Sequence, residues 1–352
     1  MRILIEPNDV LMFRESKPYT AGEAHLARSI FPLPQAIAGA LRSAILINNN
    51  FSDEACEFTG YKEDEPKFEI LGHFLFKDKE FFSTPLDVVK AKGVEGYFFV
   101  KPLFLEHWNR FIFKGKSIHF ESVGGFLSFE NLIEYLREDL NEDELEDIVR
   151  HDLIIKESRI GIKLGDTKTT EEGFLYKAEF LRLSKCVKIS VWIGEDGGKL
   201  NRLLGNNGLI RLGGECRFAR FEVKDENPLS KLEKVWDEIK EEINRNGEFK
   251  LYVATPLLVK NDNRYTWDVM HLLENELNVR IRNIYPLVGK PLVFSGWNYA
   301  NNRPKPNRYA IPSGSVYFVE FEGKIELDRP YLKLGKLKGL GYGLCFMGVG
   351  KW

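Results

Sequence analysis

The pattern that decides the fold prediction is QAIAGALRSAILI, residues 35–47, where apolar side chains recur at spacings of three and four. This spacing is typical of an amphipathic helix. Before it stand the short apolar run MRILIEP, residues 1–7, which has the character of a buried strand, and a loop rich in proline and glycine. The chain therefore opens with a strand, a loop and a helix.

A second unit of this kind begins at KLYVA, residues 250–254. A helix is expected near residues 267–277, and strands are expected near 279–287 and 290–297. Two such units, each with further strands, predict an α+β protein built from two tandem ferredoxin-like (RRM-like) domains.

The domain boundaries follow from the segments between these units. We expect an N-terminal ferredoxin-like domain over residues 1–224, with an inserted, projecting β-hairpin at about 158–193, where alternating apolar residues flank a polar tip. Apolar residues at helical spacing predict a connecting helix within residues 225–247. The C-terminal ferredoxin-like domain then covers residues 248–352 and contains a glycine-rich loop.

Composition limits the possible functions. The chain has 352 residues, of which 43% are hydrophobic, so a disordered or fibrous chain is excluded. The formal net charge of −2 excludes a uniformly basic nucleic-acid-coating protein, and any polyanion site must be local. The N-terminus lacks the apolar core of a signal peptide, and the apolar run at 36–47 is too short to span a bilayer. We expect a soluble, cytoplasmic protein that does not bind membranes.

Cofactor and metal motifs are missing from the sequence. The four cysteines are widely separated and form no CxxC pair, so we expect ordinary buried thiols rather than disulfides or a zinc site. The chain also contains no GxxxxGK[ST] or GxSxG motif. These absences predict a protein without a metal, a cofactor or a catalytic nucleophile.

Positive charge is concentrated near the C-terminal end. Between Leu277 and Val319 there are six basic residues and no acidic residue, together with Tyr285, Trp297, Tyr299 and Tyr309. Cations mixed with aromatic rings favour single-stranded nucleic acid, although rings in the core beside solvated cations would give the same pattern. Residues 298–308 are rich in asparagine, proline and basic residues, which predicts an exposed loop.

The chain ends with LGKLKGLGYGLCFMG, residues 334–348, an apolar strand preceded by alternating glycines and two lysines. Glycine permits close approach of a backbone to a ligand and can present N–H groups to phosphate. A tight turn would produce the same sequence, and the segment is not a dinucleotide-binding fingerprint because it precedes a strand.

Three separated stretches resemble the RAMP superfamily of CRISPR proteins, and within it the third subunit of the Cmr (type III-B) effector. They are FRESKPY…G…SIFPLP…IAGALRS within residues 13–43, RIGI…T…EGFLY within residues 159–176, and the terminal glycine-rich segment. The likeness extends over nearly the whole chain.

The resemblance implies two ferredoxin-like domains whose shared cleft binds the repeat-derived 5′ tag of CRISPR RNA. It also implies a non-catalytic subunit in antiviral defence that contacts the large polymerase-like subunit and the backbone RAMP subunits. The hairpin would be a thumb-like projection. Residues 163–166 read KLGD, without the basic residue expected close behind the aspartate, so the chemistry of the tip stays open.

The candidate RNA-binding residues are basic side chains and glycines in these motifs. They are Arg14, Lys17 and Arg42 on the N-terminal side, Arg159 and Lys163 on the hairpin, Lys336, Lys338, Gly339, Gly341 and Gly343 in the glycine-rich loop, and, in second place, Arg303 and Arg308. For Arg42, a salt bridge on the helix surface is an equally good interpretation.

An enzymatic alternative also remains open. Some RAMP relatives are metal-independent endoribonucleases that process repeat transcripts with a histidine as general acid or base. His25 precedes the first expected helix and could act in this way. The six histidines show no pairing in the sequence, which favours the binding role.

Overall fold

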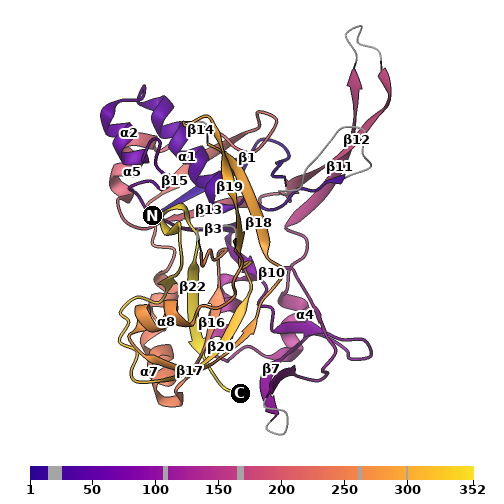
Figure 1. Ribbon diagram of the computed structural model, residues 1–352, viewed down its shortest axis with the longest axis vertical. Helices are drawn as coiled ribbons and strands as arrows, with labels where there is room; N and C mark the ends of the chain where they lie inside the picture. The colour runs from indigo at the N-terminus through magenta and orange to yellow at the C-terminus, as the bar shows by residue number, and fades with distance from the viewer. Residues whose placement is uncertain (15–25, 106–109, 165–169, 261–263, 299) are drawn as a thin grey trace.

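The computed structural model describes residues 1–14, 26–105, 110–164, 170–260, 264–298 and 300–352. It combines helices with sheets that are almost entirely antiparallel, so the expected α+β class is confirmed. Two large sheets dominate, one in the upper half and one in the lower half of Figure 1. The assignment to tandem ferredoxin-like domains and its boundaries stay predictions.

The upper sheet has seven antiparallel strands. Their order is β10 (Phe126–Ser128), β4 (Lys79–Ser83), β3 (Ile70–Lys77), β13 (Lys188–Ile193), β1 (Arg2–Pro7), β15 (Phe218–Lys224) and β14 (Asn207–Arg211). Three helices pack over it, namely α1 (Pro34–Asn48), α2 (Asp53–Thr59) and α5 (Gly197–Leu204).

Helix α1 forms where the sequence pattern places it. Pro34 stands at its start, where a missing N–H costs nothing. Ile37, Leu41 and Ile45, which are four residues apart, are all completely buried in one core with β1. The helix thus fixes the position of Arg42 beside its buried face.

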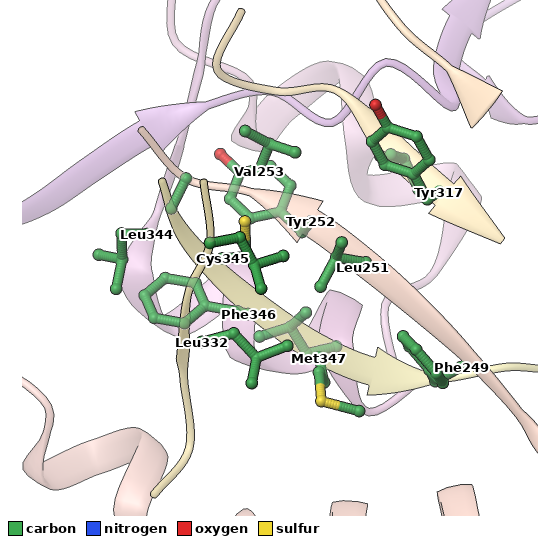
Figure 2. Close-up of a cluster of buried hydrophobic side chains, with 14 of the residues drawn as sticks. Phe249, Leu251, Tyr252, Val253, Tyr317, Leu332, Leu344, Cys345, Phe346 and Met347 are labelled. Carbon is green, nitrogen blue, oxygen red and sulfur yellow. The ribbon is translucent and has the colours of Figure 1, made fainter. Parts of the chain in front are cut away.

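The lower sheet has five antiparallel strands. Their order is β17 (Arg280–Leu287), β20 (Val316–Glu322), β16 (Glu248–Val253), β22 (Leu344–Val349) and β21 (Leu332–Lys333). Figure 2 shows the apolar side chains that β16 and β22 bury at its centre. Helices α7 (Trp236–Asn246) and α8 (Met270–Leu277) pack against this sheet.

The expected connecting helix is divided into α6 (Ser230–Glu233) and α7. The backbone tightens between them, where the Val235 N–H donates to the Leu232 carbonyl at 3.2 Å, three residues back.

The two sheets share an apolar core. Helix α3 (Phe129–Leu136) contacts β4 and β10 of the upper sheet and β22 of the lower one. Phe346 of β22 has its ring centroid 5.8 Å from that of Phe82 and 6.2 Å from that of Phe129. Aromatic packing of this kind links the two halves of the molecule.

A long hairpin extends from the body of the molecule at the upper right of Figure 1. It consists of β11 (Ile154–Leu164) and β12 (Thr170–Leu183), and β2 (Leu26–Ala27) pairs with β12 in parallel. The expected projection at 158–193 is therefore present but ends earlier. Residues 188–193 instead form β13, because their apolar side chains are buried between β1 and β3.

The remaining elements are short. They are β5 (Val88–Lys90), β6 (Phe98–Phe99), β9 (Glu121–Ser122), the ribbon of β7 (Lys101–Leu105) and β8 (Arg110–Lys114), α4 (Leu145–Ile148), and the 3₁₀ helices Glu142–Glu144 and Lys338–Leu340. No helix among the described residues is long and apolar enough to cross a membrane. All four cysteines are free, but Cys186 and Cys216 are exposed, contrary to the expectation of buried thiols.

The prediction of an exposed loop at residues 298–308 is wrong in part. Most of this range belongs to β19 (Arg303–Ala310), which pairs with β18 (Leu292–Asn298) in a two-stranded ribbon. Pro304 and Pro306 suggest a loop, but a ribbon has two edges and tolerates residues without an N–H.

Candidate nucleic-acid interface

The loop at residues 60–66, directly after α2, is contacted by α1, by the β18–β19 ribbon and by the glycine-rich segment, here residues 335–343. From α1, Arg42 donates through Nη2 to the carbonyls of Gly60 at 2.6 Å and Glu63 at 3.0 Å, and through Nη1 to that of Asp64 at 3.4 Å. Three carbonyl acceptors fix the guanidinium in one orientation. Arg42 therefore braces this loop.

The β18–β19 ribbon contacts the same loop from another side. Arg308 Nη2 lies 3.7 Å from Asp64 Oδ2, and Arg308 is only 6% exposed. At the other end of β19, the Asn301 side chain donates to the Lys62 carbonyl at 3.2 Å. Arg303 is exposed near this end. The ribbon thus brings one second-place candidate, Arg308, to the loop that Arg42 braces, whereas no contact of Arg303 with this loop is seen among the described residues.

The glycine-rich segment reaches the loop through Gly339, whose N–H donates to Glu65 Oε2 at 2.8 Å. The N–H of Gly341 donates to the Lys338 carbonyl at 3.0 Å, and that of Gly343 to the Pro256 carbonyl at 2.9 Å. The N–H of each candidate glycine therefore donates a hydrogen bond within the protein. This differs from the expectation that these N–H groups are presented to phosphate.

Close packing explains Gly343. It has φ +73°, and a Cβ added there would lie 1.9 Å from the Leu334 carbonyl oxygen. Only glycine tolerates both the left-handed conformation and this approach. The glycine lets the chain fold back so that the Leu334 N–H can donate to the Gly343 carbonyl at 2.8 Å.

The basic side chains of this segment are those of Lys336 and Lys338. Both side chains are exposed, and neither forms an ion pair within the part of the chain that the structure describes. The 3₁₀ turn that contains Lys338 contacts β3 and α1. Lys338 is thus held on a fixed turn beside the braced loop.

Positive charge is in excess where these segments meet. Helix α1, residues 60–66, β18–β19 and residues 335–343 carry seven basic residues and three acidic ones. Burial lowers the pKa of Lys305, and the neighbouring guanidinium groups of Arg42 and Arg308 lower it further. An anion bound here would relieve the mutual repulsion of these cations.

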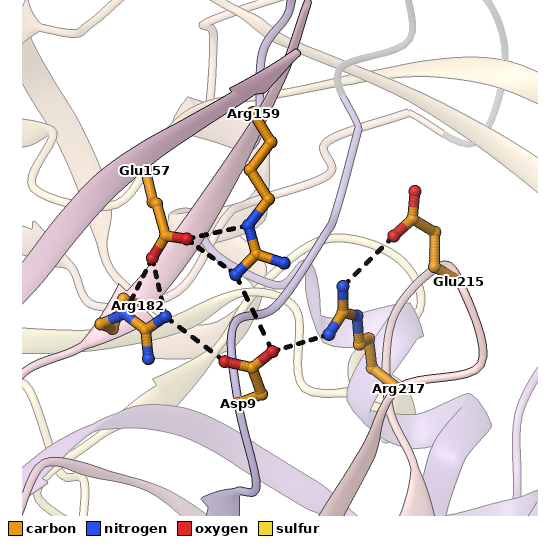
Figure 3. A network of polar contacts seen from close by, with 6 residues as sticks. All are labelled: Asp9, Glu157, Arg159, Arg182, Glu215 and Arg217. Carbon is orange, nitrogen blue, oxygen red and sulfur yellow. Dashed lines mark hydrogen bonds and ion pairs between the residues drawn. The ribbon is translucent and has the colours of Figure 1, made fainter. Parts of the chain in front are cut away.

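Arg159, midway along β11 of the projecting hairpin, belongs to a different network (Figure 3). Its guanidinium binds Glu157 at 2.7 and 2.8 Å, lies 3.9 Å from Asp9 and covers the Phe180 ring at 4.9 Å. These partners hold Arg159 against the protein. Its role in RNA binding stays a prediction.

The other N-terminal and hairpin candidates are placed less fully. Arg14 is exposed, and its backbone forms an isolated antiparallel β-bridge with that of Ser29. Lys163 lies within β11, but its side chain is not among those described. Lys17 and His25 lie outside the described residues. The structure therefore brings Arg42, Arg308 and Gly339 into contact with one loop, with Lys338 next to Gly339. Within the described part of the chain, it does not show Arg303, Lys336, Gly341, Gly343 or Arg159 in contact with that loop.

The sequence reasoning missed other residues at this surface. Lys62 and Lys305 line a groove beside the braced loop, together with Phe51, Tyr61 and Trp297. The sequence does point to Trp297 and Lys305, since both belong to the basic and aromatic region between Leu277 and Val319. No sequence pattern points to Phe51 and Tyr61, because their exposure depends on how α2 packs.

Comparison with known proteins gives concordant results. A family model described as "CRISPR-associated protein (Cas_Cmr3)" matches residues 3–350. A curated relative, "CRISPR system CMR subunit Cmr3" of Saccharolobus solfataricus, is 27% identical, with 97% of this chain and 94% of the relative covered.

Two solved structures share the fold. One is titled "Cryo-EM structure of the Type III-B Cmr-beta bound to cognate target RNA", and its matching chain is 22% identical with a TM-score of 0.53. The other, of the same assembly also bound to AMPPnP, has a chain that is 20% identical, again with a TM-score of 0.53. Each match covers 90% of this chain and 86% of the other.

Proposed function

The chain belongs to the Cas_Cmr3 family of CRISPR-associated proteins, and from this premise we propose that it is the non-catalytic subunit of a type III-B complex that binds the 5′ repeat-derived tag of CRISPR RNA. In this role it contacts the large polymerase-like subunit and the backbone RAMP subunits of the Cmr complex. The complex targets RNA in antiviral defence.

The observation that carries the proposal is the pair of exposed lysines, Lys336 and Lys338, beside an excess of basic groups. A tag held as a single strand needs cations for its phosphates and flat faces for its bases. The surface around residues 60–66 supplies both, because exposed rings lie in the same groove as Lys62 and Lys305. The small net charge of −2 is consistent with a subunit that binds RNA locally.

The strand order supports the tandem ferredoxin-like arrangement, which is also part of the proposal. In the lower sheet, the first strand, β16, lies between β20 and β22, and α8 follows it before β17. A split βαβ unit has this arrangement. The domains would cover residues 1–224 and 248–352, and the tag would bind where they meet.

The test is a double variant, Lys336→Glu with Lys338→Glu, assembled into the full complex. We expect weaker binding of CRISPR RNA and a log–log salt slope that is smaller by about 0.7 for each lost phosphate contact. The measurement is RNA affinity by filter binding at several salt concentrations.

The matched control is Lys185→Glu with Lys234→Glu, which reverses two exposed lysines in other parts of the fold. It should leave the slope at the wild-type value. A wild-type slope in the Lys336 and Lys338 variant would show that these side chains do not contact the tag.

A further inference from the structure

We infer that the groove lined by α1, Phe51, residues 61–63 and the described part of the β18–β19 ribbon binds one unstacked nucleotide of the RNA strand. Its base would lie against Trp297, and its phosphate would lie against Lys305. This inference rests on the proposed function and deepens it, because it assigns a second contact to the same surface.

The groove has the size of a small ligand site. Its volume is about 320 Å³, at the lower end of the range for ligand pockets. Helix α1 forms one wall with Gly39, Arg42 and Ser43, and the ribbon forms the opposite wall with Trp297 and Lys305. The Asn301 side chain donates to the Lys62 carbonyl, which ties the ribbon to the loop that Arg42 of α1 braces.

Three aromatic rings line the groove and remain open to solvent. Phe51 is 51% exposed, Trp297 48% and Tyr61 37%. The rings of Phe51 and Tyr61 meet edge to face, with centroids 5.8 Å apart and an interplanar angle of 78°. Clustered exposed rings commonly mark a binding surface. Every nucleobase has a flat face that can stack on such a ring.

The cations of the groove differ in how far they are already engaged. Arg42 is committed to three backbone carbonyls. Lys62 Nζ lies 5.7 Å from the Tyr61 ring centroid. Lys305 forms no ion pair with any described residue, yet it is close enough to Arg42 and Arg308 for both to lower its pKa. Lys305 is therefore the cation best placed to receive a phosphate oxygen.

The combination of rings and excess cations distinguishes a nucleotide from an apolar peptide side chain. An aliphatic side chain would use the rings but would leave Lys305 beside Arg42 and Arg308, whose influence on its pKa exceeds the opposing influence of Asp64. A nucleotide uses both, because its base and its phosphate are joined through one sugar. Glu63, the acidic residue in the lining, is outnumbered by Arg42, Lys62 and Lys305.

The experiment compares Trp297→Ala and Lys305→Gln in the assembled complex loaded with CRISPR RNA. Stacking of one base is worth about 1–3 kcal/mol, so Trp297→Ala should weaken RNA binding by about 5- to 150-fold. Trp297→Phe keeps a ring and should restore most of the affinity. Lys305→Gln should lower the salt slope by about 0.7, as expected for one phosphate.

Matched controls come from the same chain. Trp267 is 46% exposed but does not line the groove, so Trp267→Ala should leave RNA affinity unchanged. Lys185→Gln serves in the same way for the lysine. A photo-crosslink between a 4-thiouridine-substituted RNA and residue 297 should appear in the wild type and disappear in Trp297→Ala.

The outcomes separate this inference from the proposed function. If the wild-type complex holds CRISPR RNA and the Lys336 and Lys338 variant weakens it, but both groove variants retain wild-type affinity, slope and crosslinks, the groove inference is overturned alone. Groove variants that lose a protein partner and keep the RNA also overturn it. A wild-type complex without CRISPR RNA removes the proposed function itself.

Discussion

At the scale of single residues, Asp87 carries a buried carboxyl group whose charged form is disfavoured by its burial. Asp87 is 2% exposed and accepts a hydrogen bond from the Tyr135 hydroxyl at 2.8 Å. Burial raises its pKa to about 6, and the opposing influence of Lys250 is too weak to prevent this. Lys250 is itself paired with Glu138 and lies 4.0 Å from the Tyr135 ring centroid.

This raised pKa predicts a pH dependence of stability. The folded state holds the Asp87 proton more tightly than the unfolded chain, whose carboxyl titrates near 3.9. The stabilising contribution is therefore complete below about pH 4 and is lost as the pH rises through about 6. Asp87→Asn keeps an acceptor for Tyr135 and should remove this loss.

The measurement is the free energy of unfolding by urea between pH 4 and pH 7. Relative to Asp87→Asn, the wild type should become less stable over this range. Asp328→Asn, at an exposed position, should follow the wild type. Parallel curves for the wild type and Asp87→Asn would contradict the assignment of a raised pKa to Asp87.

At the scale of elements, the projecting hairpin is attached to the upper sheet by the charged network of Figure 3. Asp9, just after β1, lies 2.8 Å from Arg217 and 3.3 Å from Arg182. The backbone supports this link, since Leu11 and Leu181 exchange N–H to carbonyl bonds at 2.7 and 2.9 Å. One carboxylate thus joins arginines from β12 and from the segment before β15.

Asp9→Ala should loosen the base of the hairpin selectively. Exposed ion pairs contribute weakly to stability, so amide hydrogen exchange at the base of β11 and β12 should quicken by up to about fivefold. Exchange in β16 and β22 should not change. Acceleration of equal size in β16 and β22, or none in the hairpin, would contradict this anchoring role.

Elements were predictable where the signal is local. Helix α1 follows from apolar spacing within 13 residues, and a projecting hairpin follows from alternation on both sides of a polar tip. Strand β19 was missed because Pro304 and Pro306 have the local signature of a loop. Its pairing with β18 overrides that preference. Residues 188–193 were assigned to the hairpin because their alternation is the same whether the partner strand lies in a hairpin or in a sheet.

At the scale of the whole molecule, the candidate surface depends on contacts between distant parts of the chain. Gly339 and Glu65, which share a hydrogen bond, are 274 residues apart in sequence. No periodicity or motif reports such a pairing. The sequence could therefore identify basic residues and glycines as candidates, but only the fold shows that the glycine N–H groups are occupied and that the lysines remain exposed.

The shared core has a consequence for how RNA would be held. Phe82 and Phe129 pack against Phe346, so the strand that follows the glycine-rich segment is fixed to the upper sheet. Lys338 and the loop at residues 60–66 should therefore keep one relative position with or without RNA. A preformed surface loses less entropy on binding.

The central claim is most directly tested by purifying the native complex, sequencing its RNA and mapping photo-crosslinks onto this chain. The account predicts CRISPR RNA whose 5′ tag crosslinks to residues 335–343 or to the facing surface of α1 and residues 60–66. Absence of CRISPR RNA, or crosslinks confined to a cleaved 3′ end, would contradict it and would favour the processing nuclease.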